Sequence, residues 1–316
     1  MSNVSRVSVV LTVLNESKTI AETLKRLIKQ SKKPDEIIVA DGGSSDGTWE
    51  YLLTLSKDTA KNRQKPRIIV KQTIGNRSKG RNLAIKLASS ELIAITDAGC
   101  LANQDWLEEL LKKKDAEKAE VVAGFYHGLP KNNFEKAVVP YVLVMNDKIN
   151  HENFLPATRS MLLTKNVWQK LEGFDEKLSD NEDYAFAHLI KKSGYKIAFA
   201  EKAQVGWQPR SNLSSFCWMI YRFARGDARA QIFRPKVFLI FVRYLFLLLL
   251  AMSGYYWLIL AFLCVYFFWA IAKNQRYVDG GWFYLPILQV LSDWAVMLGT
   301  FAGVLSRACN KTVGNC

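Results

Sequence analysis

The chain has 316 residues, with 43 lysines and arginines against 29 aspartates and glutamates, which gives a formal net charge of +14. Hydrophobic residues make up 49% of the sequence, which excludes a disordered or a collagen-like chain. The five cysteines are scattered and form no Cys-x-x-Cys pair, which argues against a zinc framework or a disulfide scaffold and fits a reducing compartment.

The first hundred residues alternate short apolar runs with amphipathic segments. Residues 6–13 form a β-branched run typical of a buried parallel strand, and the following segment has apolar residues at helical spacing, with Ser17 as its predicted N-cap. Further strands are predicted at residues 36–40, 67–71 and 92–96, with helices between them. This alternation predicts a parallel sheet covered by helices on both faces. No signal peptide precedes the first strand, so we expect this part in the cytosol.

Polar loops follow three of the predicted strands. They comprise residues 12–16, residues 41–46 and residues 97–99. Because ligands of open α/β sheets bind at the carboxyl ends of the strands, we expect the three loops to form one site.

The residue types in and near these loops suit a nucleotide diphosphate. Asp41 offers acceptor oxygens to a base or a ribose, Asp97 can hold a divalent cation, and Arg81 can face an anion or a base. Each aspartate also has a structural explanation: Asp41 and Asp46 can be turn or capping residues, and Asp97 can cap the segment toward Trp106. The three loops in this order are more specific than any of these residues alone.

A second group of carboxylates lies further along the chain. Gly173-Phe174-Asp175-Glu176 leads to Asn181-Glu182-Asp183-Tyr184, which opens a predicted helix. Carboxylates in a first helical turn are favourable by about 0.3–1 kcal/mol, so a structural role is one interpretation. The other interpretation is general-base catalysis, which requires a carboxylate within reach of a reacting hydroxyl.

Two arginines and a tryptophan precede the C-terminal region. Trp207 is expected to pack in the core. Arg210 and Arg225 suit the phosphate oxygens of a bound donor or of a lipid, and contact with anionic headgroups is equally open. The three histidines are isolated in the sequence and are interpreted as structural or surface residues.

The sequence becomes overwhelmingly apolar over residues 237–305. A membrane-crossing helix needs about 20 residues, so residues 237–272 allow two short crossings folded back at Ser253-Gly254, and residues 282–305 allow a third. Arg243 interrupts the first run and either snorkels or marks a segment that lies in the interface. A buried helical subdomain is the alternative interpretation.

The positive charges favour a membrane over a nucleic acid. A basic stretch from Arg222 to Lys236 precedes the first apolar run, and positive flanks favour the cytoplasmic side. Lys273 and Arg276 return to that side after a hairpin, whereas a third crossing would place Arg307 and Lys311 outside, which conflicts with the same rule. The basic residues carry no base-stacking or recognition motif, so no nucleic-acid partner is expected.

Several motifs resemble the inverting family-2 glycosyltransferases with a GT-A fold. The resemblance begins with Val9-Val10-Leu11-Thr12-Val13-Leu14-Asn15-Glu16 and Ile37-Ile38-Val39-Ala40-Asp41-Gly42-Gly43-Ser44-Ser45-Asp46-Gly47-Thr48. It continues in Gly80-Arg81-Asn82 and Ile95-Thr96-Asp97-Ala98-Gly99 and extends from residue 6 to about residue 230.

The resemblance implies an α/β fold of the GT-A type. A Rossmann-like, mostly parallel sheet would carry helices on both faces, followed by C-terminal transmembrane helices. Residues 1–230 would form the glycosyltransferase domain, with residues 1–100 as the nucleotide-sugar half and residues 101–230 as the acceptor half. Residues 231–316 would form a membrane region with two to three hydrophobic helices.

The resemblance also implies roles for individual residues. Asp183 matches the base that takes the proton from the acceptor hydroxyl, with Glu182 beside it. The residues implied in nucleotide-sugar binding are Thr12, Leu14, Glu16, Asp41, Gly43, Arg81, Asp97 and Ala98. Asp97 is also implied in holding Mg²⁺ or Mn²⁺. The family's usual Asp-x-Asp motif ends here in Gly99, so either one aspartate acts with the diphosphate oxygens or the dependence on metal is weakened.

The sequence thus predicts a multi-pass protein of the cell membrane that acts as an inverting glycosyltransferase on the cytoplasmic side. The expected donor is a UDP- or GDP-sugar, and the expected acceptor is a lipid-linked or cell-envelope glycan. Gln208 is followed by Pro209-Arg210-Ser211 instead of the Gln-x-x-Arg-Trp of processive synthases, which favours transfer of a single sugar. One alternative is a non-catalytic membrane scaffold, suggested by Gly99. The other is a nucleotidyltransferase, which would require a Gly-rich basic loop after the first strand.

Overall fold

The computed structural model describes residues 6–61 and 64–313, with side chains described up to residue 307. The chain divides into two compact units. The first comprises Met1–His127 and Ile149–Gln208, and the second comprises Gly128–Lys148 and Pro209–Cys316. The boundary predicted at residue 230 falls inside the second unit.

The described part of the first unit is built on an eight-stranded sheet with the strand order β3-β2-β1-β4-β7-β6-β8-β5. The strands are β1 Val7–Val13, β2 Glu36–Asp41, β3 Arg67–Gln72, β4 Leu92–Ile95, β5 Cys100–Ala102, β6 Val121–Gly128, β7 Met161–Thr164 and β8 Ile197–Trp207. Strands β1 to β4 pair in parallel, whereas β7 is antiparallel to both β4 and β6, and β5 is antiparallel to β8. The α/β architecture is confirmed, and the sheet becomes mixed in its second half.

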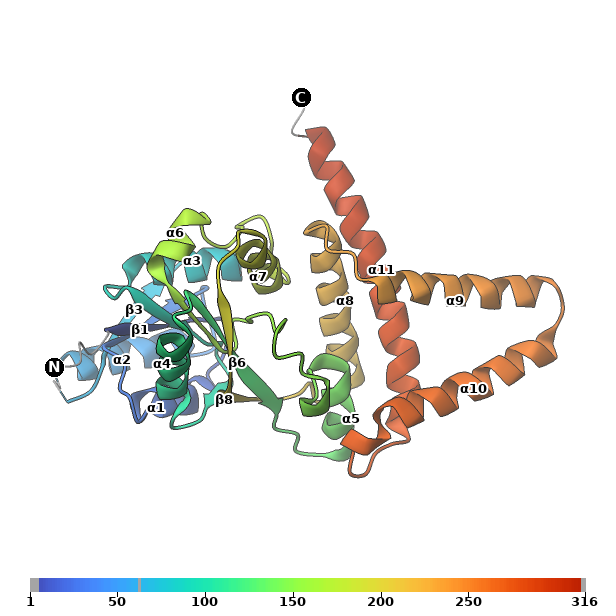
Figure 1. Ribbon diagram of the computed structural model, residues 1–316, viewed down its shortest axis with the longest axis horizontal. Helices are drawn as coiled ribbons and strands as arrows, with labels where there is room; N and C mark the ends of the chain where they lie inside the picture. Colours follow the sequence, from blue (N-terminus) through green and yellow to red (C-terminus); the bar gives the residue numbers. More distant parts are fainter. Residues whose placement is uncertain (1–5, 62–63, 314–316) are drawn as a thin grey trace. The chain divides into compact units, whose positions relative to one another are not determined.

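Helices cover both faces of this sheet (Figure 1). They are α1 Ile20–Ile28, α2 Thr48–Lys61, α3 Arg77–Leu87, α4 Trp106–Glu117, α6 Lys165–Lys170 and α7 Glu182–Lys192. One core packs β1 residues such as Leu11 against α1, α2 and α4, and the other packs Val10 and Ile38 against α3 and α7. The β-branched runs of β1 and β2 are buried on both faces, as a covered parallel sheet requires.

The predicted cap of the first helix is wrong. Helix α1 has Thr19, not Ser17, as its N-cap residue, and the Thr19 side chain makes no capping hydrogen bond. The Ser17 backbone N–H is instead bonded to Asp46 of the next loop.

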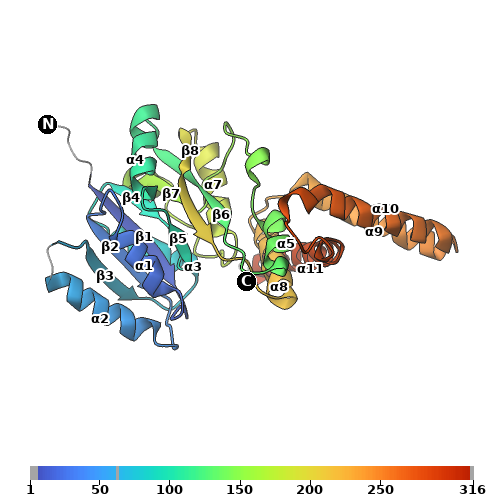
Figure 2. The same cartoon turned by 90° about the horizontal axis from the view of Figure 1, so that it is seen from below.

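The second unit is helical in its described part. It contains α5 Asn133–Val142, η1 Asn146–Lys148, α8 Leu213–Arg229, α9 Pro235–Met252, α10 Tyr256–Asn274, η2 Gln275–Tyr277 and α11 Tyr284–Val313. Three stretches are long and apolar enough to cross a membrane: Pro235–Met252, Tyr256–Tyr277 and Tyr284–Arg307. Within this unit, the α9–α10 hairpin runs crosswise to α8 and α11 (Figures 1 and 2). The predicted apolar helices and the fold-back at Ser253-Gly254 are therefore present.

Candidate active site

The strand order brings the three predicted loops to one edge of the sheet. Strand β1 lies between β2 and β4, so the loops that follow these strands are neighbours. Thr12 lies near the end of β1, Asp41 is the last residue of β2, and Asp97 follows the end of β4.

The loops after β1 and β2 are joined by hydrogen bonds. The Asn15 backbone N–H donates to Ser44 Oγ (2.8 Å), and the Ser17 N–H donates to Asp46 Oδ2 (3.0 Å). Asp46 Oδ1 accepts from the Thr48 hydroxyl at 2.5 Å. Hydrogen bonds from Thr48 and Ser17 hold the pKa of Asp46 well below its ordinary value. Asp46 thus has the structural role that the sequence left open.

Asp41 presents one unused oxygen at this edge. The residue is fully buried, and its Oδ1 accepts from the backbone N–H groups of Gly43 and Ser44 (both 2.9 Å) and from Gln72 Nε2 (3.0 Å). Burial raises the pKa of Asp41, but the hydrogen bonds from Ser44, Gln72 and Gly43 outweigh it and lower the pKa. Its Oδ2 is buried and has no partner among the described residues. An ionised oxygen without a partner is suited to an N–H or O–H donor of a ligand.

Arg81 of α3 joins two carboxylates from distant parts of the chain. It is 2% exposed, and it donates to Asp97 Oδ1 (2.7 Å) and to Glu182 Oε1. Burial lowers the pKa of Arg81, but Asp97 and Glu182 raise it above its ordinary value, so the guanidinium stays charged. The end of β4 and the start of α7 are therefore connected through one cation.

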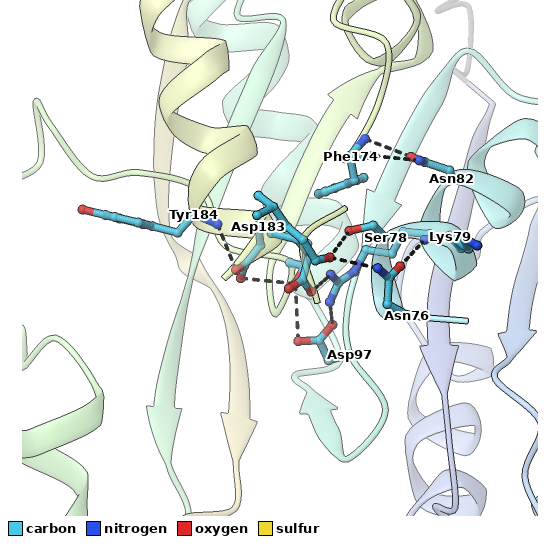
Figure 3. Close-up of polar contacts among 12 residues, drawn as sticks. Asn76, Ser78, Lys79, Asn82, Asp97, Phe174, Asp183 and Tyr184 are labelled. Atoms are coloured by element: carbon cyan, nitrogen blue, oxygen red, sulfur yellow. Dashed lines mark hydrogen bonds and ion pairs between the residues drawn. The ribbon is translucent and has the colours of Figure 1, made fainter. Parts of the chain in front are cut away.

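Thr158 lies between the carboxylates of Asp97 and Asp183. Its Oγ1 is 3.4 Å from Asp97 Oδ2 and 3.4 Å from Asp183 Oδ2, and Figure 3 shows these two aspartates facing each other. The second oxygen of Asp183 accepts from the Tyr184 N–H at 2.9 Å. Asp97, Glu182 and Asp183 thus lie together around Arg81 and Thr158.

The two carboxylates bound to Arg81 have opposite pKa shifts. Burial raises the pKa of Asp97, but Arg81, Arg77 and Arg159 outweigh it, and the pKa is lowered. The pKa of Glu182 is raised, because burial and the nearby Asp183 outweigh the attraction of Arg81. Asp97 is therefore ionised at neutral pH.

Polar side chains of α3 hold the segment that leads into α7, which the sequence reasoning missed (Figure 3). Asn82 Nδ2 donates to the Phe174 carbonyl (2.8 Å), and Asn82 Oδ1 accepts from the Phe174 N–H (2.9 Å). Ser78 Oγ donates to the Leu178 carbonyl (3.0 Å). Ser78 and Asn82 are four residues apart on one helical face, a spacing that could have indicated this contact.

The sequence reasoning also missed Thr158 and Arg159. The Arg159 guanidinium lies 5.1 Å from the ring centres of both Tyr126 and Trp207, a geometry for cation–π attraction. Its charge contributes to the lowered pKa of Asp97. Trp207 packs against the core, as expected. No local pattern distinguishes Thr158 or Arg159 in the sequence, because their partners lie far along the chain.

The remaining predicted residues occupy varied positions. Leu14 is exposed, and the Glu16 carboxylate accepts from the Thr19 hydroxyl. Gly43 has a φ of +97°, which favours glycine, and lets the loop turn after Asp41. Ala98 directly follows Asp97 and is partly exposed. Arg210 and Arg225 belong to the second unit, and their contact with phosphate stays a prediction.

The residues around Asp97 fit a cation that arrives with a diphosphate. Position 99 is glycine with a φ of +80°, so it offers no side-chain ligand. Among the described residues, no group of three or more His, Cys, Asp or Glu side chains could hold a metal ion. Asp97 is ionised and partly exposed here. Most ligands of a divalent ion would therefore have to be diphosphate oxygens and water.

Comparisons with known proteins identify the family. The model of the family described as "Glycosyl transferase family 2" matches residues 8–168, which is more than half of the 316 residues. The succinoglycan biosynthesis protein ExoA of Rhizobium meliloti is 25% identical over 236 residues, which cover 70% of this chain and 68% of that protein.

Two solved structures are similar in fold. The mannosyltransferase PcManGT of Pyrobaculum calidifontis, in complex with GDP-Man and Mn²⁺, aligns with 98% of this chain and 79% of its own, with a TM-score of 0.56 and 18% identity. TarS 1–349 of S. aureus, in complex with UDP-GlcNAc, aligns with 69% of this chain and 65% of its own, with a TM-score of 0.51 and 20% identity. At these identities the similarity shows the fold alone.

Proposed function

Because the chain belongs to glycosyl transferase family 2, we propose that it moves a sugar from a nucleotide-diphosphate donor to an acceptor hydroxyl with inversion at the anomeric carbon. The ion pairs of Arg81 with Asp97 and Glu182, with Thr158 lying between Asp97 and Asp183, carry this proposal. Asp97 precedes Glu182 and Asp183 by more than 80 residues in the sequence. An inverting transfer needs a donor anchor and a base in one place.

The donor binds at the edge formed by β1, β2 and β4. Asp41 accepts from the base or the ribose through its unpartnered Oδ2. The other residues proposed to contact the nucleotide sugar are Thr12, Leu14, Glu16, Gly43, Arg81, Asp97 and Ala98. A UDP- or GDP-sugar is supported by the complexes of the two structural neighbours, one with UDP-GlcNAc and one with GDP-Man.

Transfer proceeds as a single displacement. The Asp183 carboxylate takes the proton of the acceptor hydroxyl as its oxygen attacks the anomeric carbon. The bond from that carbon to the diphosphate breaks with its electron pair, and the nucleoside diphosphate leaves. Arg81 is a fixed cation beside the negative charge of the leaving diphosphate. It also keeps Asp97 ionised, and Glu182 holds Arg81 in position. The processive motif is missing after Gln208, which favours one sugar per acceptor.

Asp97 is the protein residue that would hold a divalent cation, Mg²⁺ or Mn²⁺. When bound, such a cation would neutralise charge on the diphosphate. Support comes from the Mn²⁺ in the structural neighbour PcManGT and from the ionised state of Asp97.

The acceptor is proposed to be a lipid-linked or cell-envelope glycan used at the cytoplasmic face of the cell membrane. The apolar helices of the second unit and the succinoglycan role in the name of the similar ExoA support this location. The predicted division into a nucleotide-sugar half (residues 1–100) and an acceptor half (residues 101–230) is part of the proposal.

The two alternatives explain the site less well. A non-catalytic scaffold needs no buried arginine joined to two carboxylates, and burying such ions is costly. A nucleotidyltransferase needs a basic, Gly-rich loop after β1, whereas Leu14-Asn15-Glu16 is acidic and lacks glycine.

A thermal-shift panel tests the proposal. The full-length protein in detergent is heated with UDP, GDP and their sugars, with and without Mn²⁺. A nucleotide that binds the folded state raises the unfolding temperature in proportion to the logarithm of its concentration over Kd. We expect one nucleotide to stabilise and Mn²⁺ to increase the shift. An Asp41→Asn variant should lose the shift. No response to any nucleotide at millimolar concentration would contradict the proposal.

A further inference from the structure

Helices α8 and α11 pack so closely that no lipid fits between them. A Cβ built at Gly299 of α11 would lie 3.0 Å from Ala224 Cβ of α8, and one at Gly303 would lie 2.7 Å from Ala228 Cβ. Gly303 follows Gly299 by four residues, and Ala228 follows Ala224 by four residues, so α8 and α11 run in the same direction. Small residues at this spacing allow close helix contact.

The register of this pair places charged residues beside the apolar part of α11. With Gly299 next to Ala224 and Gly303 next to Ala228, α8 accompanies the second half of the stretch Tyr284–Arg307. In the same turns α8 carries four charged residues, namely Arg222, Arg225, Asp227 and Arg229. If α11 crossed a bilayer, α8 would have to enter it too, and charges at that depth are rare and unfavourable.

The α9–α10 hairpin, in contrast to α8, is apolar and largely exposed. None of the residues of α9, all of which the structure describes, is buried. The turn of the hairpin is followed by exposed Tyr255, Tyr256 and Trp257, as expected at a membrane interface. The other ends of the hairpin helices carry basic residues, Lys236 on one and Lys273 on the other. The hairpin therefore carries aromatic residues at its turn and basic residues at its opposite end.

We propose that the α9–α10 hairpin alone crosses the membrane, and that α11 lies along the membrane surface with α8. The crosswise arrangement of the hairpin and of α8 with α11 fits this orientation, because a hairpin along the membrane normal leaves α8 and α11 in the membrane plane (Figures 1 and 2). The C-terminus then returns to the side of the catalytic unit. Arg307 joins Lys236 and Lys273 on that side, and the charge conflict of a third crossing disappears.

One face of α11 is suited to the lipid surface. Trp294, Leu298, Phe301 and Leu305 follow one another at helical spacing and are 49–62% exposed. Trp294 contacts Tyr244 of α9 with ring centres 5.7 Å apart, so this apolar face continues into the hairpin that inserts. An apolar helical face next to an inserted hairpin is the arrangement of an interfacial helix.

Reporter fusions in a bacterial host test this topology with the full-length chain. Green fluorescent protein at the C-terminus is expected to fluoresce, and alkaline phosphatase at the same position is expected to be inactive. Phosphatase inserted after Gly254, at the hairpin tip, is expected to be active. An active C-terminal phosphatase or an inactive tip insertion would overturn the proposal.

A short epitope tests the same topology without the bulk of a fused protein, which could itself change how the helices insert. A short epitope is placed either at the C-terminus or after Gly254 of the full-length chain, and protease is added to intact spheroplasts. The tip epitope should be lost and the C-terminal epitope retained, with both lost after lysis. Loss of the C-terminal epitope before lysis would show a third crossing. This measurement does not depend on donor or acceptor, so it can fail while the proposed function holds.

Discussion

At the scale of single residues, environment gives similar carboxylates different tasks. Hydrogen bonds from Ser44, Gln72 and Gly43 lower the pKa of Asp41, and three arginines lower that of Asp97. Burial raises the pKa of Glu182. One oxygen of Asp183 lies 3.4 Å from the Thr158 hydroxyl, and the other accepts from the Tyr184 N–H. Asp183 is the acid of this group that we propose as the base.

Replacing Asp183 by Asn should reduce turnover about 10²- to 10⁴-fold, the usual contribution of general-base catalysis. Donor binding should change little, because the backbone contact to Tyr184 can be kept by the amide oxygen. Turnover and the nucleotide-induced thermal shift are measured on the same preparation. Asp175→Asn, an exposed carboxylate in the preceding segment, is the matched control and should behave as wild type. Equal turnover of the two variants would remove Asp183 as the base.

The lowered pKa values of Asp41 and Asp97 predict how donor binding depends on pH. Both groups have pKa values below the ordinary 3.8 in the folded protein, so both are ionised from neutral pH down to about pH 4. Between the ordinary and the folded pKa the unfolded chain binds more protons, so the stability that these groups contribute is present above pH 3.8 and is lost as pH falls further. Nucleotide affinity, measured by calorimetry, should therefore stay constant from pH 7 to pH 5. A loss of affinity with a midpoint near pH 6 would mean that another group controls binding.

At the scale of elements, the position of α3 depends on close packing against the sheet. A Cβ at Gly80 would lie 2.9 Å from Thr12 Cγ2 and 3.7 Å from Ala40 Cβ, so the helix approaches the ends of β1 and β2 at this glycine. The same helix carries Arg81, which joins Asp97 and Glu182. The distance from helix to sheet thus sets the position of the arginine.

Replacing Gly80 by Ala should destabilise the protein by about 1–3 kcal/mol, the usual effect of overpacking. The Thr12→Ser variant, which removes the methyl group in question, should be close to wild type in stability. In the double variant the alanine regains its space, so the two effects should be less than additive by more than about 0.5 kcal/mol. Thermal and chemical unfolding of the wild type, the two single variants and the double variant give the four stabilities that this comparison needs. Strict additivity would show that the Thr12 methyl does not limit the approach of α3.

At the scale of the whole molecule, the sequence predicts what depends on local pattern. Strands β1, β2 and β4, the loops that follow them and the three apolar helices were all expected, because β-branched runs, glycine-rich turns and long apolar stretches are local features. The contacts of Thr158 with Asp97 and Asp183 could not be predicted, because they join residues 61 and 25 positions apart in the sequence. The tight packing of α8 on α11 was missed for the same reason.

Arg243 is the clearest case of a residue that only the fold explains. In the sequence it interrupts an apolar run, and in the structure it donates to Asp293 of α11 at 2.5 Å. Tyr266 of α10 donates to the same carboxylate, and the Arg243 guanidinium lies 4.5 Å from the Tyr266 ring centre. One carboxylate therefore connects all three apolar helices.

The Arg243–Asp293 ion pair predicts that the double variant is more stable than either single variant. Arg243→Leu leaves a buried carboxylate without its cation, and Asp293→Leu leaves the arginine without its anion, so each should lower stability by roughly 3–5 kcal/mol. The double variant, Arg243→Leu with Asp293→Leu, removes both charges from apolar surroundings and should regain most of that loss, because a buried ion pair can be replaced by packed hydrophobic residues. Thermal unfolding in detergent, followed by size-exclusion chromatography, compares the four proteins. A double variant less stable than either single variant would mean that the pair contributes more than its mutual neutralisation. The Tyr266 hydroxyl, which loses its acceptor in both Asp293 variants, accounts for a smaller residual loss that a Tyr266→Phe variant measures separately.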